Sequence, residues 1–144
     1  MKLSTKHMKI YQTKAKKLGG TDFKEVHKKA FGIYQQIKRK SKRTPYLRSA
    51  YFKNKKIFLT LFWQHLWEKE KWQDRMRRLK YYAAALELIQ KSKFVPKSKA
   101  NPNKPGETLH RFTGKTNDHD LFHVQIKENK NSRRKDLISI FPEH

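Results

Sequence analysis

The strongest constraint on the fold is a change of hydrophobic period near residue 107. Before it, apolar side chains recur every three or four positions, which is the period of a helix. After it, apolar and polar residues alternate, most clearly in Phe122, His123, Val124, Gln125, Ile126 and Lys127. Side chains of a strand point alternately to its two faces, so the alternation predicts a strand with one apolar and one polar face.

Three strands are expected in this last quarter of the chain. They are Leu109–Thr113, Asp120–Lys127 and Lys135–Phe141, and the segments between them are short. Short connections favour antiparallel neighbours, so the strands predict a meander. Ile138 and Ile140 are expected on its apolar face, with Leu137, Ser139 and Phe141 opposite.

About three helices are expected before the meander. Asp22 and Glu25 form a capping-box pattern that starts a helix over about Phe23–Lys40. The next helices are expected over Ser49–Lys69 and Gln73–Lys91. The run IFLTLFW (residues 57–63) also fits a strand by propensity, so its assignment stays open between the two. Residues 92–106 contain three prolines without periodicity, which is typical of a loop.

The predicted fold class is α+β, with N-terminal basic helices followed by a small antiparallel meander packed on them. Residues 1–20 are expected to form a flexible basic arm, 21–92 the helical region, 93–106 a Pro/Lys-rich loop and 107–144 the sheet. The sheet and the helices are expected to make one domain.

The charge is large and unevenly distributed. The chain has 36 Lys and Arg against 12 Asp and Glu, a net charge of +24. Residues 107–144 hold seven basic and six acidic residues, so nearly all of the excess lies in residues 1–106. Such a balance predicts a polyanionic partner, which can be nucleic acid, an anionic membrane or an acidic protein. Nucleic acid fits best, and the sheet-face residues described below favour RNA.

Other classes fit the sequence less well. There is no cysteine, which excludes disulfides and thiolate metal sites. The only His/Asp cluster, residues 118–120, falls at an expected turn, so neither a metal site nor a cofactor is predicted. No apolar run reaches the roughly 20 residues of a membrane span and the N-terminus has no apolar signal core, so a cytoplasmic location without a membrane partner is expected.

The polar face of the meander collects residue types that can cleave RNA. That chemistry needs a base, an acid and cations for the phosphate charge. His110 or His123 is the predicted acid or base, and the predicted cations are Arg111, Lys115 and Lys127. Gln125 and Ser139 would position the substrate. Further substrate contacts are expected from basic residues elsewhere, namely Arg133, Arg134, Arg77, Arg78, Lys38, Arg39 and Arg43.

The runs LHRFTGKT, LFHVQIKEN and KDLISIFPE resemble the C-terminal sheet of the barnase/EndoU/colicin/RelE-like (BECR) ribonucleases, in particular their phage- and mobile-element-associated branches. The resemblance covers about 35 residues. It implies a helix-then-sheet fold, metal-independent RNA cleavage and a toxin held in check by an acidic antitoxin. The positions that match are His110, Arg111, Lys115, Gln125, Lys127 and Ser139. The family sheet usually has a fourth strand, so either IFLTLF supplies it here or the sheet is smaller.

Three functions remain open from the sequence. The first is a toxin-like ribonuclease of a toxin–antitoxin or phage-conflict system. The second is a non-catalytic nucleic-acid-binding protein that uses the basic helical region. The third is an interaction protein whose Trp-rich middle segment docks an acidic partner.

Overall fold

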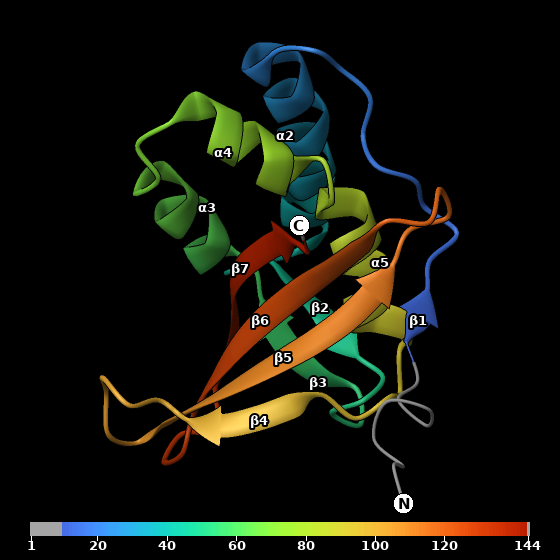
Figure 1. The fold of residues 1–144 in the computed structure, drawn as a ribbon. Coiled ribbons are helices and arrows are strands. Elements are labelled where there is room, and N and C mark those ends of the chain that lie inside the picture. Colours follow the sequence, from blue (N-terminus) through green and yellow to red (C-terminus); the bar gives the residue numbers. More distant parts are fainter. Residues whose placement is uncertain (1–9, 144) are drawn as a thin grey trace, which may run out of the picture.

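The structure is a computed structural model that describes residues 10–143, and in this range the chain forms four helices and one seven-stranded mixed sheet (Figure 1). The helices are α2 (Phe23–Lys40), α3 (Thr60–Trp67), α4 (Trp72–Leu79) and α5 (Tyr82–Lys91). The strands are β1 (Tyr11–Gln12), β2 (Tyr46–Ser49), β3 (Lys55–Phe58), β4 (Lys97–Ala100), β5 (Glu107–Lys115), β6 (Leu121–Asn129) and β7 (Lys135–Pro142).

The strands lie in the order β1-β5-β6-β7-β3-β2, and β4 also pairs with β5. The pairs β5–β6, β6–β7, β2–β3 and β4–β5 are antiparallel, whereas β1–β5 and β3–β7 are parallel. β1 and β4 share one edge of β5, because β1 pairs with residues 114–115 and β4 with residues 108–111. The sheet therefore contains strands from almost the whole length of the chain.

The predicted arrangement of helices followed by a separate meander is wrong. β1 precedes the first helix, and the β2–β3 hairpin lies between α2 and α3 and joins the sheet through β7. The predicted helix over Ser49–Lys69 is wrong in its first half. Only one residue, Leu59, separates β3 from α3. Ile57 and Phe58 therefore belong to the end of a strand, and Leu61 and Phe62 belong to the start of a helix. The run IFLTLFW is thus half strand and half helix.

The predicted helix over Gln73–Lys91 is two helices. The break at Lys80 and Tyr81 allows two consecutive tyrosines to be buried on different neighbours. Tyr81 stacks on Phe122 of β6 at 5.5 Å, and Tyr82 packs on Phe62 at 5.5 Å and on Trp63 at 5.1 Å. The expected loop over residues 92–106 contains β4.

Several expectations are confirmed. α2 has the predicted bounds, and Asp22 caps it by accepting from the Glu25 backbone N–H at 2.8 Å. The three terminal strands are present, each longer than predicted, and they pair antiparallel as expected. Phe122, Val124 and Ile126 are fully buried.

The N-terminal segment is held by one carboxylate of α5. Glu87 accepts hydrogen bonds from the Tyr11 hydroxyl and from the backbone N–H groups of Lys14 and Ala15. Burial, together with the bond to Glu87 and its negative charge, raises the pKa of Tyr11 to about 12. The expected arm over residues 1–20 falls partly on residues 1–9, which lie outside the described residues.

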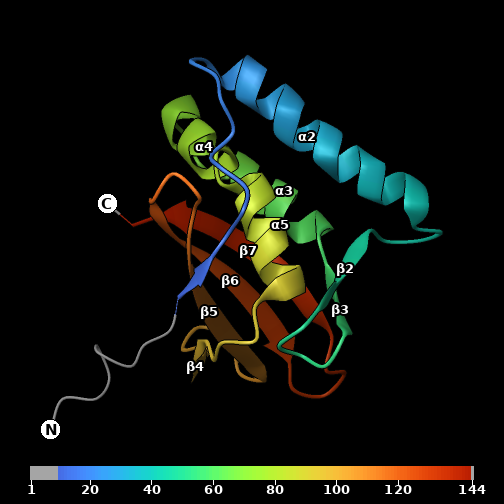
Figure 2. The same ribbon diagram turned by 90° about the vertical axis from the view of Figure 1, so that its right-hand side faces the viewer.

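The helix α5 lies close against one face of the sheet (Figure 2). Its small residues Ala84 and Ala85 are fully buried. Gly114 of β5 allows the closest approach, because a Cβ there would lie 2.5 Å from Leu88 Cδ1 and 2.7 Å from the Phe122 ring. Both neighbours are buried and have little room to move.

A β-bulge changes the facing of β7. Gln125 pairs with Ser139, but the next residue, Ile126, pairs with Leu137, so Ile138 is the extra residue. The bulge turns Leu137 to the core face, where it is fully buried, and leaves Ile138 half-buried. The predicted facing is therefore wrong here, because Leu137 rather than Ile138 lies on the core face.

Gly114→Ala should lower the free energy of unfolding by about 1–3 kcal/mol, because the added methyl overpacks the contact with Leu88 and Phe122. Urea unfolding measures the change. Gly32→Ala is the matched control, since a Cβ at Gly32 meets nothing within 4 Å and alanine favours the helix. Equal stability of the two variants would contradict the close approach of α5 to β5.

Candidate active site

A strongly basic groove lies between the β2–β3 hairpin and the ends of β5, β6 and β7. Its volume is about 1310 Å³. Its lining contains seven Lys and Arg side chains but a single carboxylate, that of Glu128. The basic residues are Arg48, Lys53, Lys55, Lys56, Arg133, Arg134 and Lys135. Low-dielectric walls concentrate the field of such a set, so the groove should attract polyanions.

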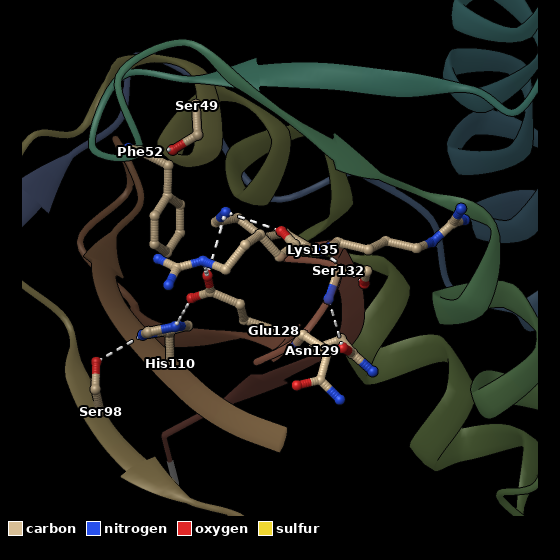
Figure 3. A network of polar contacts seen from close by, with 11 residues as sticks. Ser49, Phe52, Ser98, His110, Glu128, Asn129, Ser132 and Lys135 are labelled. Carbon is tan, nitrogen blue, oxygen red and sulfur yellow. Dashed lines mark hydrogen bonds and ion pairs between the residues drawn. The ribbon is translucent and has the colours of Figure 1, made fainter. Parts of the chain in front are cut away.

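Glu128 and His110 form a buried pair at the floor of the groove (Figure 3). His110 Nε2 donates to Glu128 Oε1 at 2.9 Å, and His110 Nδ1 lies 2.6 Å from the Ser98 hydroxyl of β4. His110 is only 8% exposed and Glu128 only 7%. Both ring nitrogens are thus held, and the ring orientation is fixed by partners on two different strands.

Two cations complete the surroundings of Glu128. Its Oε2 lies 2.9 Å from Arg133 Nε and 3.4 Å from Lys135 Nζ, although neither contact has the geometry of a hydrogen bond. Burial opposes ionisation of this carboxyl. The bond from His110 and the charges of Lys135 and Arg133 outweigh the burial, and they hold the pKa of Glu128 below its ordinary value. Glu128 is therefore an ionised carboxylate at neutral pH.

The sheet places these groups on its core face. Glu128 continues the row of Phe122, Val124 and Ile126, and His110 lies on the same side as Phe112. The bulge in β7 brings Lys135 to this face, where it pairs with Glu128 across the strands. The polar cluster is therefore the end of the hydrophobic core, at the point where the core opens to solvent.

The turn of the β2–β3 hairpin covers the cluster. Lys53 and Asn54 have positive φ angles of 55° and 64°, and this tight turn projects Phe52 inward. The Phe52 ring lies 5.0 Å from the His110 ring and 5.1 Å from Lys135 Nζ. A cation that lies over the face of an aromatic ring is attracted to the ring, and this attraction is stronger where water is excluded.

The structure separates the predicted catalytic residues. His110 is in the groove, whereas Arg111, Gln125, Lys127 and Ser139 lie on the opposite face of the sheet together with His123. His123 Nε2 donates to Glu143 at 2.8 Å, and Lys127 lies 3.4 Å from Glu107. The Arg111 guanidinium lies 5.3 Å from the centre of the Phe141 ring.

The remaining predicted residues are distributed over several elements. Arg133 and Arg134 line the groove. Arg78 makes contacts within the fold: it donates hydrogen bonds to the Asp74 carboxylate at 3.1 Å and to the Ser139 hydroxyl at 3.1 Å. Half-buried Lys115 lies beside β1, and Arg77 is exposed on α4. Lys38, Arg39 and Arg43 are exposed at the end of α2 and after it.

Sequence reasoning missed Glu128, Lys135, Ser98 and Phe52. One signal was present for Glu128: it is the acidic residue that continues the apolar alternation of 122, 124 and 126. The predicted strand ends at Lys127, one residue before it. Lys135 could not be placed, because its facing depends on the bulge.

Neither a metal site nor a membrane helix is found among residues 10–143. No three His, Asp or Glu residues in this range are grouped to hold a metal ion. No helix in it is both long and apolar enough to cross a bilayer. Comparisons of the chain with protein-family models, curated proteins and solved structures found no match.

Glu128→Gln should lower the free energy of unfolding at pH 7 by about 3–5 kcal/mol, because it leaves the buried Lys135 without its counter-charge. The pKa of Glu128 is lower in the folded protein than in the unfolded chain, so the stabilisation is complete above about pH 4.3. It is lost as the pH falls through the lower folded value.

Urea unfolding of both proteins between pH 2 and pH 7 measures this difference. The difference in the free energy of unfolding between the wild type and Glu128→Gln should become smaller as the pH approaches 2. A gap that is independent of pH would show that the charge of Glu128 does not stabilise the fold.

Proposed function

We propose that this protein is a metal-independent endoribonuclease whose proton-transfer pair is Glu128 and His110. The observation that supports the proposal is a buried carboxylate–imidazole pair at the floor of a groove lined by seven cations. The cations suit a phosphodiester substrate, and a carboxylate and an imidazole are groups that can supply the base and the acid of a phosphodiester displacement.

In this reaction Glu128 accepts the proton of the ribose 2′-OH, and the 2′-oxygen attacks the phosphorus. The bond from phosphorus to the 5′-oxygen breaks, and His110 reacts as the imidazolium: its Nδ1–H leaves the contact with Ser98 and gives its proton to that oxygen, which leaves a neutral imidazole. Histidine is the side chain that most often transfers protons in catalysis. The products are a 2′,3′-cyclic phosphate and a 5′-hydroxyl, so no water or external reagent enters the step.

Lys135 and Arg133 stabilise the negative charge that develops on the phosphoryl oxygens. Both lie at the carboxylate, at 3.4 Å and 2.9 Å, so a phosphate that reaches Glu128 also reaches them. The Arg133 side chain is largely exposed and covers Glu128. We expect it to turn toward the incoming phosphate and uncover the carboxylate.

The donor set of the groove supports cleavage without a metal ion. Mg²⁺ prefers several oxygen ligands, and the groove offers one carboxylate, which two cations already contact. The seven cations would also repel a divalent cation.

The resemblance to the BECR ribonucleases stays a hypothesis and points to the same reaction. With it we propose a toxin that acts in the cytoplasm and is inhibited by an acidic protein, whose charge would complement the groove. The alternative is a non-catalytic nucleic-acid-binding protein, for which the net charge of +24 is sufficient.

Glu128→Gln and His110→Gln should each reduce RNA cleavage by about 10²–10⁴-fold in the presence of EDTA, because each removes one proton-transfer group. Cleavage of a labelled RNA is followed on a gel, and the product ends are tested for the cyclic phosphate. His123→Gln is the matched control, since His123 lies on the opposite face of the sheet, and it should keep full activity.

Two outcomes would contradict the proposal. Loss of activity in His123→Gln with retention in His110→Gln would move the site to the polar face of the meander. Tight RNA binding by the wild type with no cleavage under any condition would favour the non-catalytic alternative.

A further inference from the structure

The outward face of the β2–β3 hairpin alternates aromatic rings and cations. Its inward side chains, Leu47 and Ile57, pack in the core or against it. The outward positions form two cross-strand pairs, Tyr46 with Phe58 and Arg48 with Lys56. We call these four residues, together with Arg134 from the β6–β7 loop, the hairpin surface.

Each ring of the hairpin surface carries a cation on its face. Lys56 Nζ lies 4.6 Å and the Arg48 guanidinium 5.4 Å from the centre of the Tyr46 ring. The Arg134 guanidinium lies 4.1 Å from the centre of the Phe58 ring. The two rings are 6.2 Å apart, so the five side chains form one continuous layer.

The charge of this layer is only partly compensated. Arg134 lies 3.3 Å from Asp136, which is buried beneath it. Arg48 donates to the backbone oxygen of Asn54 at 3.0 Å, which uses one of its N–H groups and leaves its charge. Lys56 is exposed, and no carboxylate pairs with it among the described residues.

The hairpin surface connects the candidate active site to a second basic region. Four of its five residues, Arg48, Lys56, Phe58 and Arg134, also line the basic groove. At the other end, Tyr46 and Lys40 line the same hollow beside the end of α2. The exposed basic residues there are Lys38, Arg39, Lys40, Lys42 and Arg43.

We propose that the hairpin surface binds unpaired nucleotides of a single-stranded RNA that runs from the groove toward the end of α2. Unpaired bases stack on aromatic rings and on guanidinium planes, and neighbouring cations hold the backbone phosphates. A duplex cannot use the surface in this way, because its bases are already stacked on each other. The proposal rests on the ribonuclease function and names its substrate class.

The test is a binding measurement on an RNA that cannot be cleaved. A fluorescent 12-nucleotide 2′-O-methyl RNA lacks the 2′-hydroxyl that the reaction needs, and its affinity is measured by anisotropy. The variant Tyr46→Leu/Phe58→Leu removes both ring faces but keeps apolar side chains of similar size. It should bind the single strand about tenfold or more weakly, and a duplex of the same sequence unchanged.

Two further variants sharpen the test. Lys56→Gln removes one exposed charge and should reduce the slope of log affinity against log salt concentration by about 0.7. Trp72→Ala, which removes an exposed aromatic residue from α4, is the matched control and should leave the affinity unchanged. A thermal melt of each variant confirms that it is folded.

Unchanged affinity of a folded Tyr46→Leu/Phe58→Leu variant for the single strand would overturn the proposal, as would an equal loss for the duplex. A single-stranded DNA of the same sequence distinguishes RNA from unpaired nucleotides in general, and binding as tight as that of RNA would overturn the RNA assignment. If binding depends on the two rings while unmodified RNA stays intact, the ribonuclease function fails and the hairpin surface stands as a binding site.

Discussion

The buried charge of Glu128 is the constraint on which this end of the molecule depends. A buried carboxylate costs several kcal/mol unless charges and hydrogen bonds compensate it. The compensation comes from β5 through His110, from β7 through Lys135 and from the loop between β6 and β7 through Arg133. The strands must therefore keep their register here, and the same register places the His110–Glu128 pair beside the cations of the groove.

The β-bulge between Ser139 and Leu137 makes this register compatible with the core. In a regular strand, Leu137 and Lys135 would point to the polar face, because side chains alternate with a period of two. One extra residue, Ile138, reverses the facing, so that Leu137 packs on Ile126 and Lys135 reaches Glu128. Bulges are frequent beside active sites for this reason, since they redirect a side chain without changing the rest of the strand.

Local patterns predicted the parts of the fold that depend on local periodicity. The cap at Asp22, the helix that follows it and the three terminal strands could be read from spacing alone. The β2–β3 hairpin could not, because its second strand joins α3 through Leu59 alone and gives the whole segment a helical period. The site was predicted only in part. His110, Arg133 and Arg134 were candidates. Glu128 continues the apolar alternation one residue beyond the predicted strand end, whereas the facing of Lys135 depends on a bulge that no pattern revealed.

The basic excess lies in residues 1–106 and the His110–Glu128 pair lies on the terminal strands, yet the topology brings the two together. The hairpin belongs to the basic first three quarters of the sequence, yet it pairs with β7 and covers His110 with Phe52. It thereby brings Arg48, Lys53, Lys55 and Lys56 to the groove whose floor comes from the terminal strands. Because the β3–β7 pairing holds both sides of the groove, the cations of the hairpin lie beside the buried carboxylate and imidazole, where the proposed substrate would meet both.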